Sequence, residues 1–159
     1  MTDRDQDLAA RTRAPAVDRT MNRRSPSVAE SPLRVLIADD EADFATSLVT
    51  VLEADGHAVR HARSGREAIA MAEEWCPAYV LLDIYMPGMS GFTAARELRR
   101  RMPGVAMTLV MMSARDLDES TLLEAGVAGF DRCVDKADAT TAVRALLAEG
   151  PLPPNREAR

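Results

Sequence analysis

Hydrophobic and polar residues alternate in blocks between residues 33 and 150, and these blocks predict five strands and five helices in turn. Short, largely apolar runs are typical of strands, and the most apolar of them have the composition of strands buried on both faces. Strict alternation of strand and helix indicates right-handed β-α-β units, so the pattern predicts a parallel sheet with helices on both faces. The predicted strands are Arg34–Ala38, Ala58–Ala62, Tyr79–Asp83, Met107–Met112 and Arg132–Val134.

Apolar residues at helical spacing fill the segments between these strands. Phe44, Leu48 and Leu52 would share one face of the first helix. Ser64, followed three residues later by Glu67, is a capping-box signature at the start of the second helix. Glycine and proline commonly end helices. The expected helix ends are Gly56, Pro77, Pro103, Gly126 and Gly150.

Three details of the later helices are open to test. The third helix is expected over residues 91–102, with the arginines Arg99–Arg101 mostly solvated. The fourth helix is expected over residues 118–125. Asp138 is expected to cap the fifth helix, because a carboxylate at that position accepts hydrogen bonds from the first free backbone N–H groups.

The two ends of the chain differ from the alternating segment. Residues 1–32 carry arginines, prolines and scattered acids without a sustained hydrophobic period, which predicts a disordered N-terminal extension. A basic docking arm is an alternative interpretation of this segment, and Met21 is an alternative start. Prolines in residues 151–159 predict a flexible C-terminal tail. Residues 33–150 therefore form one predicted domain.

Composition and charge narrow the class of protein. The 159-residue chain is 47% hydrophobic and 28% charged, which suffices for a normal buried core. Its net charge of −5 does not favour direct binding to nucleic acid. Cys76 and Cys133 lack metal or disulfide spacing, so we interpret them as small apolar residues in a reducing compartment. With no membrane-length apolar stretch and no signal core, we expect a cytoplasmic protein without membrane insertion.

Asp83 is the most informative candidate for chemistry. It ends the apolar run Tyr79–Asp83, and Pro87, Gly88 and Gly91 follow it in a segment that favours a tight loop. Open α/β sheets bind ligands at the carboxyl ends of their strands. A carboxylate at the end of a buried strand is therefore where a functional site is expected.

Four predicted strands carry polar residues at or just beyond their carboxyl ends: Asp39 and Asp40, Asp83, Ser113, and Lys136. Three carboxylates that meet in one pocket repel one another unless a cation lies among them, and oxygen ligands suit Mg²⁺. A carboxylate beside such an ion can act as a nucleophile toward phosphorus. Lys136 would neutralise charge on a phosphoryl group, and Ser113 could donate a hydrogen bond to it.

These residues lie in motifs that resemble the receiver domain of two-component response regulators. The resemblance covers residues 33–150, about three quarters of the chain. Asp83 lies 43 residues after Asp40, Ser113 lies 30 after Asp83, and Lys136 lies 23 after Ser113, close to the family's spacing. Each motif alone is weak evidence, but four in order at strand ends are strong. The matching segments are Ile37–Glu41, Leu82–Gly91, Met112–Arg115 and Gly129–Lys136.

The resemblance implies a fold and a class of protein. The fold would be the flavodoxin-like receiver fold, with five parallel strands in the order 2-1-3-4-5. The partners would be a sensor histidine kinase or a histidine phosphotransfer protein, and a downstream target protein. Only nine residues follow Gly150, so we expect a stand-alone receiver of the chemotaxis type that signals through protein contacts. It would be a phosphoacceptor that assists its own phosphorylation and dephosphorylation, and not an enzyme.

The resemblance also implies a role for each site residue. Asp83 would accept the phosphoryl group. Asp39 and Asp40 would bind Mg²⁺ together with Asp83 and the backbone carbonyl of Tyr85. Ser113 and Lys136 would bind the phosphoryl group, and movement of Ser113 toward it would start the conformational switch.

Two departures from the family pattern leave alternatives open. Cys133 stands where the family often has an aromatic residue that turns inward on activation, and Ala137 stands where it usually has proline. The first departure motivates a second hypothesis, a receiver-like scaffold that binds partners independently of phosphorylation. A third hypothesis is a magnesium-dependent hydrolase with Asp83 as nucleophile, which needs an additional general acid or base near Asp83.

Overall fold

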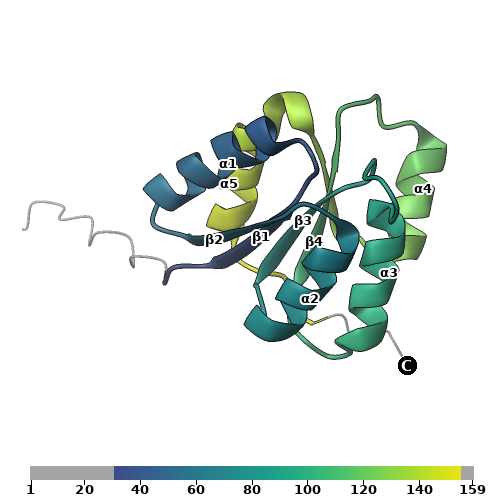
Figure 1. The fold of residues 1–159 in the computed structure, drawn as a ribbon, viewed down its shortest axis with the longest axis horizontal. Helices are drawn as coiled ribbons and strands as arrows, with labels where there is room; N and C mark the ends of the chain where they lie inside the picture. The colour runs from purple at the N-terminus through teal and green to yellow at the C-terminus, as the bar shows by residue number, and fades with distance from the viewer. Residues whose placement is uncertain (1–30, 155–159) are drawn as a thin grey trace, which may run out of the picture. The chain divides into compact units, whose positions relative to one another are not determined.

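A five-stranded parallel sheet forms the centre of the described residues, 31–154 of a computed structural model (Figure 1). Its strand order, β2-β1-β3-β4-β5, confirms the order that the family resemblance implied. Predictions for residues 1–30 and 155–159 lie outside the described residues. The strands are β1 (Arg34–Ala38), β2 (Ala58–Ala62), β3 (Tyr79–Asp83), β4 (Thr108–Ser113) and β5 (Arg132–Asp135).

Five α-helices and one short 3₁₀-helix connect the strands and cover both faces of the sheet. Helices α1 and α5 lie on one face, and α2, α3 and α4 lie on the other (Figure 1). This is the layered parallel arrangement that the alternating pattern predicts. The helices are α1 (Ala42–Ala54), α2 (Gly65–Trp75), α3 (Gly91–Arg101), α4 (Glu119–Ala128), η1 (Lys136–Asp138) and α5 (Ala139–Glu149).

The central strand β3 is buried at every position, which explains its continuous apolar composition. Its side chains alternate between two hydrophobic clusters: Val80 and Leu82 pack under α2, α3 and α4, whereas Leu81 packs under α1 and α5. Strand β4 is likewise buried throughout. Asp83 therefore lies at the end of a strand that is buried throughout and that pairs with another fully buried strand.

Most helices begin and end at the capping residues, glycines and prolines expected from the sequence, but Asp138 and Gly126 are exceptions. Ser64 accepts a hydrogen bond from Glu67 N at 3.2 Å, which confirms the cap of α2. Asp138 occupies the N-cap position of α5 but its side chain makes no cap hydrogen bond. Asp135 caps η1 instead, through Ala137 N at 2.8 Å. Helix α4 also continues past its expected end at Gly126.

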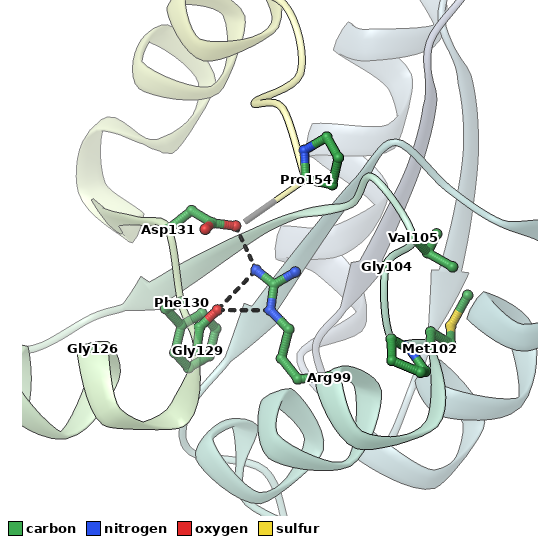
Figure 2. Close-up of a pocket in the computed structure, with 10 residues that line it drawn as sticks. Arg99, Met102, Gly104, Val105, Gly126, Gly129, Phe130, Asp131 and Pro154 are labelled. Atoms are coloured by element: carbon green, nitrogen blue, oxygen red, sulfur yellow. Dashed lines mark hydrogen bonds and ion pairs between the residues drawn. The ribbon is translucent and has the colours of Figure 1, made fainter. Parts of the chain in front are cut away.

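Arg99 is not solvated in the way that the sequence indicated. Its guanidinium group donates hydrogen bonds to the backbone oxygen of Gly129 and pairs with Asp131 at 2.6 Å (Figure 2). It also donates to the backbone oxygen of Met107 at 2.9 Å. The same Asp131 oxygen accepts from Leu109 N at 2.8 Å. Arg99 thus joins α3 to the segments that lead into β4 and β5.

A cavity of about 330 Å³ lies beside this arginine, at the end of the sheet opposite to Asp83. Pro154 lies at one side of it (Figure 2). Nearby, Leu152 N donates to the Thr108 hydroxyl at 3.1 Å. Residues 151–154 therefore lie against the start of β4.

We expect Arg99→Leu to lower the free energy of unfolding by about 2–3 kcal/mol, because it leaves partly buried carbonyl and carboxylate oxygens without a donor. Arg100→Leu is the matched control: the next arginine along α3 is exposed and, among the described residues, forms its ion pair with Glu97 of its own helix, so its replacement should cost little. Urea unfolding of both variants measures the difference. Equal losses would contradict the role assigned to the Arg99 contacts.

Candidate functional site

The carboxyl ends of β1, β3, β4 and β5 bring the predicted site residues together. Strand register pairs Asp83 with Met112, and Ser113 with Asp135, so the residues just beyond these strand ends share one edge of the sheet. Asp39 N donates to Ala62 O at 3.1 Å, which extends the pairing of β1 and β2 to the site. Residues from four segments that are far apart in sequence meet here because parallel strands place all their carboxyl ends on one side.

Three carboxylates form a cluster at this edge. One oxygen from each of Asp39, Asp40 and Asp83 lies within 4.8 Å of the others. Asp39 and Asp83 are buried, with 0% and 4% of their surface exposed, whereas Asp40 is exposed. Oxygen ligands at this separation fit a hard divalent cation, and the exposed member leaves a route from solvent.

Lys136 is the cation that the described structure places among these carboxylates. Its Nζ lies 2.6 Å from Asp39 Oδ2 and 3.1 Å from Asp83 Oδ2. Burial lowers the pKa of Lys136, but the hydrogen bonds and charges of Asp39 and Asp83 outweigh burial and raise that pKa above its ordinary value. The lysine therefore stays charged and offsets part of the repulsion within the cluster.

Asp83 is held in place by two donors. Its Oδ1 accepts a hydrogen bond from Tyr85 N at 3.0 Å, and its Oδ2 accepts from Lys136. Burial raises the pKa of the Asp83 carboxyl, and the charge of Asp39 raises it further, against the opposing effects of Tyr85 N and Lys136. The ionised form is thus costly in the free protein, and a divalent cation would stabilise it.

Ser113 ends β4 with only 1% of its surface exposed. Its hydroxyl oxygen accepts from Arg115 N and its hydroxyl donates to Arg115 O, both at 3.2 Å. The Arg115 guanidinium carbon lies 4.6 Å from the centroid of the Tyr85 ring. The loop after β3 and the loop after β4 therefore touch through a stacked pair beside Asp83.

A family comparison agrees with this geometry. The family model of the response regulator receiver domain matches residues 35–148. The chain belongs to the response regulator receiver domain family. This family acts in two-component signalling.

Relatives and solved structures support the assignment. Protein PilH of Pseudomonas aeruginosa is 36% identical over 83 residues, which are 52% of this chain and 69% of PilH. Chemotaxis protein CheY4 of Vibrio cholerae shares the fold, with a TM-score of 0.69 at 22% identity over 74% of this chain and 98% of CheY4. TrrA of Thermotoga maritima, solved with Mg²⁺-BeF, has a TM-score of 0.65 at 26% identity over 74% of this chain and 97% of TrrA. The chain spans only 47% and 56% of two longer response regulators that it matches.

Two residues that lie near the site, His61 and Phe44, were not among the site residues predicted from the sequence. His61 on β2 approaches Asp39 O through Nε2 at 2.8 Å, and so supports the backbone of a cluster residue. Phe44 on α1 presents its ring to Lys136, with Nζ 4.8 Å from the ring centroid. Helical spacing indicated a core position for Phe44, and only the approach of η1 to α1 makes it a neighbour of the site.

Cys76 and Cys133 are both free, in agreement with their lack of disulfide spacing, and both are exposed. Cys76 adopts a left-handed conformation with φ of 48° at the end of α2. Leu122, Leu123 and Val127 on α4 are also exposed.

Within the described residues, no helix combines the length and apolar character needed to cross a lipid bilayer.

Proposed function

We propose that this receiver is a phosphorylation-controlled switch in which Asp83 accepts a phosphoryl group from a phosphohistidine of a sensor kinase or phosphotransfer protein. The observation that carries the proposal is the buried Asp83 carboxylate, which lies beside two further carboxylates and a partly buried lysine. Phosphoryl transfer needs positioned charges more than covalent chemistry from the protein. This cluster supplies both signs of charge around one nucleophile.

Asp39, Asp40 and Asp83 are the proposed protein ligands of Mg²⁺, with the Tyr85 backbone carbonyl as a fourth. The donor set fits, because each ligand is a hard oxygen and Asp39 Oδ2 is a buried oxygen that pairs with the Lys136 ammonium group. The Mg²⁺-BeF complex of TrrA is consistent with such a site in a related protein. When bound, the ion would neutralise charge on the phosphoryl oxygens.

In the proposed reaction, an oxygen of Asp83 forms a bond to phosphorus while the P–N bond to the donor histidine breaks. The imidazole leaves with the bonding electron pair and takes a proton from solvent, so that the product is an aspartyl phosphate. Lys136 would move from the Asp39 and Asp83 oxygens to a phosphoryl oxygen. Ser113 would exchange its hydrogen bonds within the loop for one to the phosphoryl group.

The signal would leave through contacts with a downstream target protein. Movement of Ser113 would shift the loop that joins β4 to α4, and the exposed face of α4 would follow. No observation favours a direct role in binding nucleic acid. A scaffold that binds partners independently of phosphorylation is disfavoured. Burying a group of charged side chains costs folding stability, and such a scaffold would not need these charges.

Intact mass spectrometry after incubation with acetyl phosphate and Mg²⁺ tests the proposal. We expect one added phosphoryl group, and none when EDTA replaces Mg²⁺. Beryllofluoride binding, followed by NMR, provides a second readout if the adduct is short-lived. A folded protein that gains no phosphoryl group and does not bind beryllofluoride with Mg²⁺ would overturn the proposal.

A further inference from the structure

The ring of Phe44 lies against the Lys136 ammonium group. Phe44 lies in the first turn of α1, is partly buried, and packs against the cluster under α1 and α5. Lys136 Nζ lies 4.8 Å from the ring centroid, within the range of a cation–π contact. The lysine side chain is only 9% exposed, so water screens the contact weakly.

Phe44 differs in kind from the other groups around this ammonium. Those in the described structure are carboxylates, namely Asp39, Asp83 and, at 3.9 Å, Glu41. Two of them belong to the proposed metal cluster. A divalent cation there would take over the oxygens that now hold Lys136 and would repel its charge. The aromatic ring binds no metal, so its attraction for the ammonium group would persist.

We propose that Phe44 is a positioning residue for phosphoryl transfer, one that keeps Lys136 at the site when the metal takes its carboxylate partners. This inference rests on the proposed function and names a part of its machinery. Lysine has a flexible four-carbon stem, so an ammonium group released from Asp39 and Asp83 would otherwise turn toward solvent. The ring restricts it to the side of the site where the phosphoryl group binds.

Phosphorylation rates of two Phe44 variants test the inference. Phe44→Leu keeps an apolar side chain but removes the aromatic face, and we expect the rate of adduct formation from acetyl phosphate with saturating Mg²⁺ to fall by about 3- to 30-fold. Phe44→Tyr keeps the face and should restore a rate close to that of the parent. Mg²⁺ affinity, measured by calorimetry, should not fall in either variant, because no metal ligand is altered.

Phe130→Leu is the control for a general effect of losing a phenyl ring. Phe130 is buried at the opposite end of the sheet, beside the cavity near Arg99 (Figure 2). We expect its phosphorylation rate to match that of the parent. If the Phe44 ring serves only to pack α1, the phosphorylation rate of Phe44→Leu should also be similar to that of Phe130→Leu and of the parent.

NMR of the Lys136 side chain gives a readout that is independent of the reaction. The ring should shift the Lys136 ε-methylene protons upfield in the parent, both without and with Mg²⁺, and Phe44→Leu should remove the shift. Loss of the shift when Mg²⁺ binds to the parent would overturn the inference, as would a Phe44→Leu rate equal to that of the parent or no rescue by tyrosine. Failure of the parent itself to form an adduct would instead overturn the proposed function.

Discussion

Replacing Asp83 with asparagine will abolish the phosphoryl adduct and, at neutral pH without Mg²⁺, will raise the melting temperature. An amide cannot accept a phosphoryl group as a carboxylate does, so no mass increase should follow treatment with acetyl phosphate. The gain in stability has a separate cause. The cluster holds three carboxylates against one lysine, and asparagine removes one buried negative charge while keeping an oxygen for the hydrogen bond from Tyr85 N.

The gain in stability from Asp83→Asn should be larger at neutral pH than at acidic pH. Burial raises the pKa of Asp83 above its ordinary value of 3.8, so the folded state holds this proton to higher pH than the unfolded chain does. Ionisation therefore costs stability as the pH rises from 3.8 through the folded pKa. Below 3.8 the carboxyl is protonated in both states, and the parent and Asp83→Asn should be about equally stable.

Thermal unfolding in EDTA at neutral and acidic pH measures this effect, at about 4 °C per kcal/mol for a domain of this size. Asp40→Asn is the matched control, because Asp40 belongs to the same cluster but is exposed, so its replacement should change the melting temperature much less. An unchanged or lower melting temperature for Asp83→Asn at neutral pH would contradict the electrostatic account. An adduct on Asp83→Asn would place the phosphoacceptor elsewhere.

Gly91→Ala is expected to damage both the fold and the site. A Cβ at this position would clash with the Asp83 backbone oxygen and would lie 2.8 Å from Ile84 Cα. These are backbone atoms of β3 and the loop after it, so no side chain can move aside. We expect a loss of about 1–3 kcal/mol in the free energy of unfolding, as for overpacked cores. We also expect at least about tenfold slower phosphorylation, because a shift of the Asp83 backbone misplaces the nucleophile.

Gly126→Ala is the matched control and should have the opposite sign. Gly126 lies inside α4, and a Cβ there meets nothing within 4 Å. Alanine should therefore stabilise the fold by about 0.5–1 kcal/mol through helix propensity, without changing the phosphorylation rate. Urea unfolding and adduct formation on both variants make the comparison. A Gly91→Ala protein as stable and as reactive as the parent would show that the loop after β3 is free to move.

The stability and reactivity of this receiver are therefore expected to oppose each other at Asp83. A buried carboxylate whose ionised form is disfavoured lowers the stability of the ligand-free protein. The same carboxylate would be stabilised by a bound metal ion and by phosphorylation. Ligand binding would relieve the repulsion within the cluster, so the largest stabilisation by Mg²⁺ should be seen in the parent and not in Asp83→Asn.

Local sequence patterns determined most of the secondary structure and which residues gather at the candidate site. Apolar runs located the strands because a strand covered by helices on both faces must be apolar throughout, as β3 is. Ser64 identified the start of α2 because its cap involves residues three apart. Acids and the lysine beyond strand ends indicated one pocket, since parallel strands share one carboxyl edge.

Only the tertiary structure decided which side chains these residues meet. Arg99 lies 30 residues before Gly129, and its sequence neighbours indicated a solvated arginine, yet it bonds to that carbonyl. Phe44 has the spacing of a core residue, and its contact with Lys136 depends on how α1 packs beside η1. The periods of strands and helices specify which face of an element is buried. They do not specify contacts between elements, which arise from packing across the whole sheet.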